Sequence, residues 1–182
     1  MSLATEPLRP LELEALGPIE RLPEPILREL RSDHAGELGA AWIYHGVLAV
    51  ARDPELRAFA EEHLRAEQAH LDFFLTQLPR RWQSSLAPLW RLAGFLLGAV
   101  PALVGSRAVY RTVAAVESFV DDHYQVQIDM LDAHPEYRWL RERLVSFRED
   151  ELHHRDEAAE RFGAAPLEGS WARIVKGGSA AG

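Results

Sequence analysis

The sequence predicts an all-α fold, and three observations carry this prediction. Signals for helix starts recur along the chain at intervals that suit whole helices. No stretch alternates between polar and apolar residues for long enough to form a β-strand. With 182 residues, of which 47% are hydrophobic, the chain can bury the core of one ordinary domain without crosslinks.

The first 25 residues are expected to form an irregular leader. Helical structure should begin near Ile26 and include residues 32–52, whose apolar spacing and alanine content are typical of a buried helix. The predicted bundle spans residues 26–163, and residues 164–182 form a short tail with room for one helical turn at 171–176. The leader is predicted from its prolines, which are Pro7, Pro10, Pro18, Pro23 and Pro25.

A second helix is marked by an N-cap signal. Asp53 is followed by a first-turn proline, Pro54, and a first-turn acid, so a helix should run from there to about residue 78. Pro79 and Pro88 bracket a connection. A run of thirteen uncharged residues, 92–104, follows that connection.

The last two helices also have recognisable starts. Gly105 precedes a helix that is expected to reach about residue 132. His134, Pro135 and Glu136 repeat the cap-and-proline signal, and the helix that they open should end near Gly163.

Composition excludes several classes of site and partner. The chain has no cysteine, which rules out disulfides, thiolate metal sites and a catalytic thiol, so any metal must bind through carboxylates and imidazoles. The formal net charge of −8 argues against nucleic acid as a partner. The acidic amino terminus lacks the apolar run of a secretory signal and the basic character of a transit peptide.

Two Glu-x-x-His motifs stand on predicted helices, at Glu67/His70 and Glu151/His154. A spacing of three residues puts both side chains of a motif on one helical face. One such pair is expected by chance in a chain of this composition, and a solvated helix face is then the commoner explanation. The position of the motifs therefore has to supply the specificity.

An internal repeat in the sequence supplies the specificity that a single Glu-x-x-His motif lacks. Glu37 precedes the first motif by thirty residues, and Glu117 precedes the second by thirty-four, which suits two helical hairpins. A tyrosine follows each of these glutamates by seven residues, at Tyr44 and Tyr124. The same pattern of Glu, Tyr, turn and Glu-x-x-His thus occurs twice.

Charge indicates what this repeat is for. Four glutamates in a bundle interior need compensation, because an unpaired buried carboxylate is costly. Two divalent cations would balance them, and oxygen and imidazole ligands suit iron or manganese. We expect Glu67 and Glu151 to bridge the two ions, with Glu37 and Glu117 more terminal.

Five sequence blocks between roughly residues 30 and 162 are distinctive: RSDHAGELGA, LRAEQAHL, LAPLWRLAGFLLGA, AVESFVDDHY and REDELHHRDEA. They resemble the signature blocks of the demethoxyubiquinone hydroxylase family, a membrane-associated branch of the ferritin-like di-iron proteins, and come in the family's order. Ser118 stands where the family often has a second glutamate.

The resemblance implies a ferritin-like four-helix bundle that uses two iron ions and dioxygen to hydroxylate a polyprenylated benzoquinol, demethoxyubiquinol. Electrons would come from an external reductant such as NADH or from the quinol itself, since the chain has no dinucleotide-binding fingerprint. The iron ligands implied by the family are Glu37, Glu67, His70, Glu117, Glu151 and His154.

Other residues are candidates for supporting roles. His123 and Tyr124 match a His-Tyr pair of the family and are candidates for a proton or electron relay; the alternative is that they are ordinary hydrogen-bonded core residues. Asp33 and Asp121 lie one turn from Glu37 and Glu117, where they could accept the outer N–H of a ligand histidine or simply act as caps or solvated acids. Tyr44 is likewise predicted to lie next to the metal ligands without being a ligand itself.

The uncharged run predicts an additional interfacial helix. It is too short to span a bilayer, and Pro101 should interrupt a spanning helix, but such a helix can dip into one leaflet beside the anchors Trp82, Arg80, Arg81 and Arg91. A buried core helix is the alternative. The residues predicted to contact the membrane or admit the quinone are Trp90, Leu92, Phe95, Leu96 and Leu97.

The leading functional prediction is thus a peripheral membrane monooxygenase. Its arginine bias, with Lys176 as the only lysine, favours a bacterial source and hence the cytoplasmic face of an inner membrane. Partners expected are the polyprenyl quinone, dioxygen, and a second copy or another protein of ubiquinone biosynthesis. The alternatives are a ferritin- or rubrerythrin-like iron oxidase or iron-binding protein, a helical interaction module, and hydroxylation of another lipid or of an RNA nucleoside.

Overall fold

The structure, a computed structural model, describes residues 19–163, and the predicted tail and most of the predicted leader lie outside this range. The described residues contain five α-helices, three short 3-10 turns and no strand, which confirms the all-α prediction. The helices are α2 (Glu24–Val50), α3 (Pro54–Gln77), α4 (Ala87–Val104), α5 (Ser106–Leu131) and α6 (Arg138–Phe162), and the turns are η1 (Ile19–Arg21), η2 (Arg80–Trp82) and η3 (Pro135–Tyr137).

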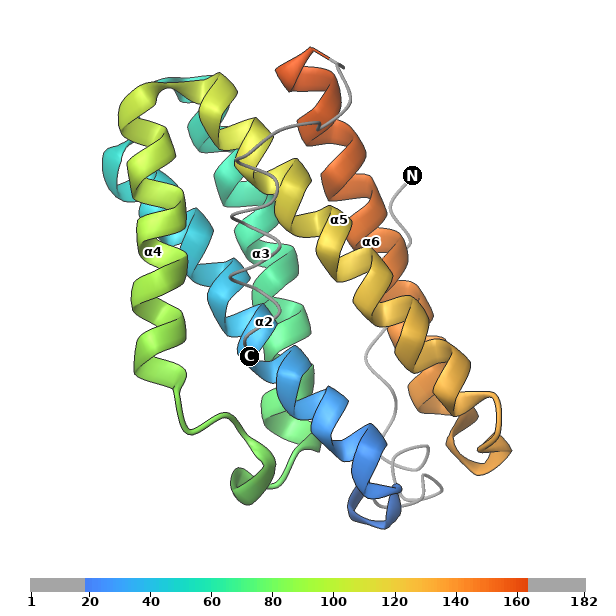
Figure 1. The fold of residues 1–182 in the computed structure, drawn as a ribbon. Helices are drawn as coiled ribbons and strands as arrows, with labels where there is room; N and C mark the ends of the chain where they lie inside the picture. The colour runs from blue at the N-terminus through green and yellow to red at the C-terminus, as the bar shows by residue number, and fades with distance from the viewer. Residues whose placement is uncertain (1–18, 164–182) are drawn as a thin grey trace.

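Four of the helices form a bundle of two hairpins. Helix α2 packs against α3, and α5 packs against α6, so each half of the sequence repeat is one hairpin. Helix α4 connects the hairpins and packs against α2 and α5 (Figure 1). The bundle thus has the four helices that the repeat predicts, with α4 as the additional one.

Most predicted helix ends are confirmed. The Asp53 carboxylate accepts a hydrogen bond from the Glu55 N–H at 3.0 Å and caps α3, as expected. Gly105, at φ +135°, separates α4 from α5, and Gly163 ends α6 in the left-handed conformation.

Two expectations at helix starts are wrong. His134 makes no side-chain cap, because Pro135–Tyr137 forms a 3-10 turn and α6 begins only at Arg138. The leader is not irregular up to residue 25: α2 begins at Glu24, and Ile19 and Leu22 are buried in the core. Pro25 is tolerated there because a first-turn residue needs no N–H donor.

The apolar core is divided into layers at the two ends of the bundle. One layer includes Leu30, Phe74 and Phe147, and the other includes Val47 and Phe59. The motif residues stand between these positions along their helices, so the sequence encloses a polar layer between two apolar ones.

Helix α4 lies unusually close to α2. A Cβ atom added at Gly98 would overlap the carbonyl oxygen of Ile43, and one added at Gly94 would overlap that of Gly39. Contrary to expectation, Pro101 does not interrupt α4, which continues to Val104. The close contact holds α4 along the bundle and leaves its other side exposed.

Candidate metal centre

The six predicted ligands meet inside the bundle. One comes from α2, two from α3, one from α5 and two from α6, and each is at most 5% exposed. Each Glu-x-x-His motif lies on one face of its helix, as the three-residue spacing requires. The ligands meet in two groups, Glu37, Glu67, His70 and Glu151 in one, and Glu67, Glu117, Glu151 and His154 in the other.

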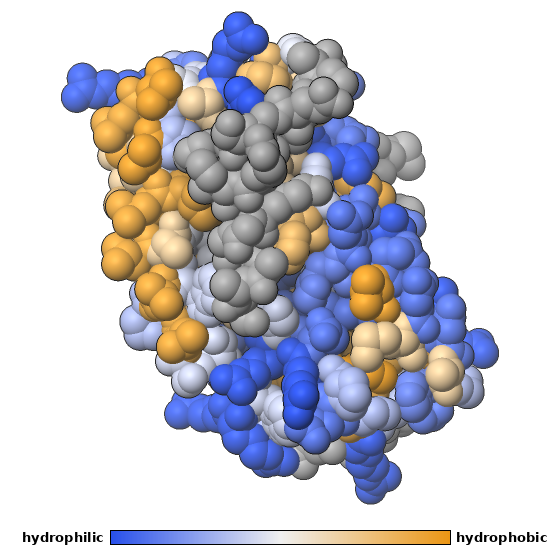
Figure 2. Space-filling model, in the orientation of Figure 1, coloured by the Kyte–Doolittle hydropathy of each residue, from blue (hydrophilic) through white to orange (hydrophobic). Residues whose placement is uncertain are grey.

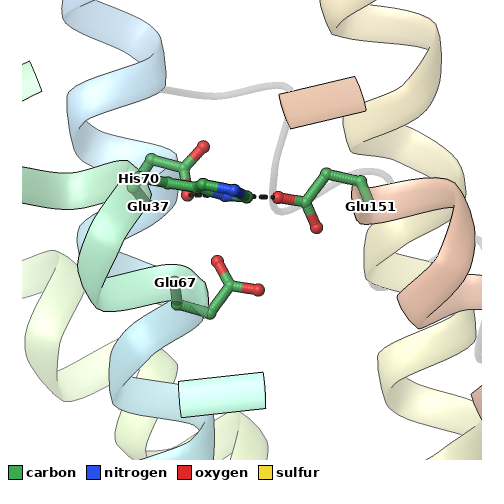
Figure 3. Close-up of side chains that lie close together, drawn as sticks. All are labelled: Glu37, Glu67, His70 and Glu151. Carbon is green, nitrogen blue, oxygen red and sulfur yellow. Dashed lines mark ion pairs between the residues drawn. The ribbon is translucent and has the colours of Figure 1, made fainter. Parts of the chain in front are cut away.

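The two groups share Glu67 and Glu151. Within each group one candidate ligand atom per residue lies within 4.8 Å of all the others. Both histidines turn Nδ1 toward the glutamates: Nδ1 of His70 lies 3.0 Å from Glu151 Oε1 and 3.6 Å from Glu37 Oε2 (Figure 3). Nδ1 of His154 lies 3.4 Å from Glu67 Oε1 and 3.3 Å from Glu151 Oε2.

The cluster leaves buried oxygen atoms without donors, which is the pattern that a metal site needs. Among the described residues, both carboxylate oxygens of Glu67 and one oxygen each of Glu37, Glu117 and Glu151 are buried and accept no hydrogen bond. Buried polar atoms are nearly always paired, so these unpaired oxygens are suited to holding cations. Carboxylate and imidazole donors without sulfur fit two divalent ions such as iron or manganese.

Without metal, protons take the place of cations. Burial, and then the charge of Glu151, raises the pKa of Glu67 to about 8. Burial also raises the pKa of Glu117 well above its usual value. Burial opposes ionisation of Glu151, but its contacts with His154 and His70 outweigh burial and hold its pKa low. The pKa of His154 rises to about 10, because contacts with Glu151 and Glu67 outweigh its burial.

A cavity of about 310 Å³ adjoins the cluster. Its wall includes carboxylates of the cluster, such as Glu37 and Glu117, and residues of α4, such as Trp90 and Leu97. Of the five residues predicted to admit the quinone, these two line the cavity. Leu92 and Leu96 are on the exposed side of α4, and Phe95 packs beside Trp42.

The comparisons with known proteins identify the family. The family model described as "Ubiquinone biosynthesis protein COQ7" matches residues 24–182. The chain is 38% identical to the Dictyostelium discoideum "NADPH-dependent 3-demethoxyubiquinone 3-hydroxylase, mitochondrial" over 88% of this chain and 76% of that protein. The chain belongs to the COQ7 family.

Bacterial and animal members are similar as well. Identity is 41% to the Rhodospirillum rubrum "3-demethoxyubiquinol 3-hydroxylase", over 71% of this chain and 61% of that protein. It is 36% to the Mus musculus "NADPH-dependent 3-demethoxyubiquinone 3-hydroxylase, mitochondrial", over 85% and 73% respectively. The match to this family of helical-bundle proteins supports the ferritin-like assignment of the fold.

Beside the cluster, three residues of the segment 123–127 contact α2. Tyr124 donates a hydrogen bond to Oε1 of Glu37. His123 Nε2 lies 3.0 Å from Asp33 Oδ1, which also accepts a hydrogen bond from Gln127 at 2.6 Å. The hydroxyl of Tyr44 is buried and has no hydrogen-bond partner among the described residues.

The expected contacts of the two aspartates with ligand histidines are not found. Asp121 pairs instead with Arg148 at 2.7 Å and with Arg155 at 3.3 Å, because both arginines of α6 face it. Asp33 contacts His123, which is not among the six predicted ligands.

Three neighbours of the cluster were not predicted. Asp150 lies 3.3 Å from Nε2 of His70, and His63 lies 3.0 Å from Glu157 while its ring packs against His154. A helical-face argument could have found His63 and Glu157, since they stand four residues before Glu67 and three after His154. Asp150 had no such signal, because it approaches from the helix opposite His70.

Proposed function

We propose that this protein is a di-iron monooxygenase that hydroxylates the ring of demethoxyubiquinol in ubiquinone biosynthesis. The observation that carries the proposal is a cavity whose wall combines the buried carboxylate cluster with the apolar helix α4. A ring bound there lies against the cluster, and α4 offers an apolar path for a prenyl tail. The printed names of the relatives, which describe this hydroxylation, support the same substrate.

Two iron ions would be held by the six clustered residues. The sharing of Glu67 and Glu151 between the two groups supports a bridging role for them, with Glu37 and His70 completing one position and Glu117 and His154 the other. When bound, such a centre activates dioxygen so that one oxygen atom enters the ring and the other leaves as water, with two electrons from a reductant. An NADPH requirement in the relatives' names supports a nicotinamide nucleotide as that reductant.

The surrounding residues orient groups and hold protons. Tyr124 fixes Glu37 through its hydrogen bond and lines the cavity. His123 and Asp33 line the cavity too, and their 3.0 Å contact supports a role in exchanging a proton with a quinol hydroxyl bound there. The apolar wall formed by residues such as Ile43, Val116 and Leu97 limits the access of water to the ring.

Helix α4 is proposed to contact the membrane. Contrary to the expectation from the thirteen-residue uncharged run, α4 has 18 residues and is the one helix in the described part of the chain that is long and apolar enough to cross a bilayer. It packs on α2 and carries Arg91, however, which favours an interfacial position. Its exposed apolar residues form a continuous strip in Figure 2: Leu89, Leu92, Leu96, Val100, Leu103 and Val104. A large exposed strip of this kind marks an interaction site. We propose that the protein binds peripherally to the cytoplasmic face of a bacterial inner membrane. It would do so alone, as an oligomer or together with another protein of ubiquinone biosynthesis.

The test is turnover with isotopically labelled dioxygen. Iron-loaded protein, a reductant and demethoxyubiquinol are incubated, and the quinone product is analysed by mass spectrometry. We expect one labelled oxygen atom in the ring, loss of this product in Glu67→Ala, and its retention in the control Glu62→Ala, an exposed position on the same helix.

An iron oxidase is the competing outcome. Oxidation of added ferrous iron and consumption of dioxygen, with an unchanged quinone, would overturn the hydroxylase proposal. The family match favours the hydroxylase, and the absence of cysteine excludes the thiolate iron site of rubrerythrins.

A further inference from the structure

The two halves of the cluster differ at one matched position. Four residues before the motif glutamates stand His63 in the first half and Phe147 in the second. Each ring packs against the candidate ligand histidine of the opposite helix. The centroid of His63 lies 4.2 Å from that of His154, edge to face at 88°, and the centroid of Phe147 lies 4.2 Å from that of His70.

The partners of these two rings differ in polarity as well: that of His63 is polar and that of Phe147 is apolar. His63 Nε2 lies 3.0 Å from Oε2 of Glu157, six residues after Glu151. At the matched position six residues after Glu67 stands Phe73, which packs edge to face on Phe147. An apolar ring pair in one half is therefore replaced by a hydrogen-bonded pair in the other.

His63 is held on every side. Its side chain is buried, and because an ionised carboxylate can only accept, Nε2–H of His63 donates to Glu157. Arg161 donates two hydrogen bonds to Glu157, at 2.9 and 2.7 Å. The ring of His63 also stacks on Tyr44 at 17° and contacts Phe59 at 4.1 Å between centroids.

The candidate ligand histidines need different supports. His70 has a carboxylate at its outer nitrogen, since Nε2 lies 3.3 Å from Asp150. Among residues 19–163 no corresponding hydrogen bond is found at Nε2 of His154, whose contacts are with the cluster glutamates and with the rings of His63 and His153. Histidine ligands commonly depend on such an outer partner for their orientation.

We propose that His63, anchored by Glu157, is the positioning residue for His154, and that the two metal positions therefore depend on different supports. The His70 position depends on the hydrogen bond to Asp150, and the His154 position depends on the ring of His63. This inference rests on the proposed two-metal site.

The test is a Co²⁺ titration of the metal-free full-length protein, followed by ligand-field absorption and metal analysis. His63→Ala is compared with the matched control Phe147→Ala, which removes a buried ring of similar size from the other half. We expect wild type to bind two ions. His63→Ala should weaken one of them by about 10- to 100-fold and change its absorption band, the usual effect of losing such a support. Phe147→Ala should retain both, because Asp150 still holds His70.

Two further variants separate positioning from folding. His63→Phe copies the arrangement of the other half and should restore binding of both ions to within a few-fold of wild type, while Glu157→Ala should weaken the same ion as His63→Ala, but less. Unchanged binding in His63→Ala, or equal losses in His63→Ala and Phe147→Ala, would overturn the inference. If either result were found while wild type bound two ions, the inference about His63 would fail but the proposed two-metal site would not. If wild type bound no ion, both the inference and the proposed site would be overturned.

Discussion

At the scale of single residues, the site has to balance the negative charge of four buried glutamates. The sequence implies this need but does not show how it is met. Four buried glutamates need cations, and in the metal-free protein protons on Glu67 and His154 supply part of that charge. The two tyrosines of the repeat are not equivalent, since Tyr124 donates to Glu37 while the Tyr44 hydroxyl has no partner in the described part of the chain. The two halves of the repeat are therefore more alike in the arrangement of their helices than in the hydrogen bonds of their side chains.

Metal binding should release protons and strengthen with pH. Because the pKa of Glu67 is about 8 and that of His154 about 10, both hold a proton at neutral pH and must lose it to bind a cation. Affinity should rise by about tenfold per pH unit for each displaced proton, most steeply below about pH 8 and less steeply from there to about pH 10. Calorimetric Mn²⁺ titrations in buffers of different ionisation enthalpy measure this release. Glu62→Gln should leave it unchanged, and binding without proton release would refute the charge balance described here.

The Asp33–His123 pair gives a second prediction at this scale. Burial alone lowers the pKa of His123, but contacts with Asp33 outweigh it and raise the pKa. Asp33→Asn should therefore lower the pKa of His123 relative to wild type, which an NMR titration of the histidine rings detects. Asp132→Asn, which removes the partner of Arg141, is the control. A pKa of His123 that did not fall would show that Asp33 does not hold its proton.

At the scale of elements, the sequence predicted helices better than it predicted their contacts. Capping by Asp53 and the breaks at Gly105 and Gly163 were predictable, because they depend on neighbours along the chain. The start of α2 was missed because prolines within a first turn look the same as prolines in a loop. The pairing of Asp121 with Arg148 could not be predicted, since it depends on how α5 and α6 face each other.

The contact between α2 and α4 yields a stability prediction. Gly98→Ala should lower the free energy of unfolding by about 1–3 kcal/mol, because the added methyl overlaps the Ile43 carbonyl and forces the helices apart. Gly36→Ala is the matched control: its Cβ would meet no atom within 4 Å, so the higher helix propensity of alanine should leave stability equal or increased. Urea denaturation monitored by circular dichroism compares the two. Equal stability of Gly98→Ala and wild type would contradict the close packing of α4.

At the scale of the whole molecule, two duplicated hairpins enclose the site, and one added helix gives it an apolar side. The six clustered residues could be predicted because they repeat with the hairpin, whereas the cavity could not, because its wall combines residues from all five helices of the described range. The repeat could not reveal His63 and Asp150, because Phe147 and Ala66 stand at the matched positions of the other half. Only His63 had another signal, its spacing of four residues from Glu67. The repeat thus predicts what the halves share and not what distinguishes them.

Membrane binding is the prediction that belongs to this scale. Leu92 and Leu96 are 56% and 47% exposed on the apolar strip of α4, so replacing both with glutamate removes apolar contact and adds negative charge without disturbing the core. The double variant should lose most of its binding to liposomes in a flotation gradient while its melting temperature stays close to that of wild type. Val126→Glu, at a 55% exposed position on α5, should still float. If the double variant floated as well as wild type, α4 would not be the membrane contact, and the exposed strip would instead require a protein partner.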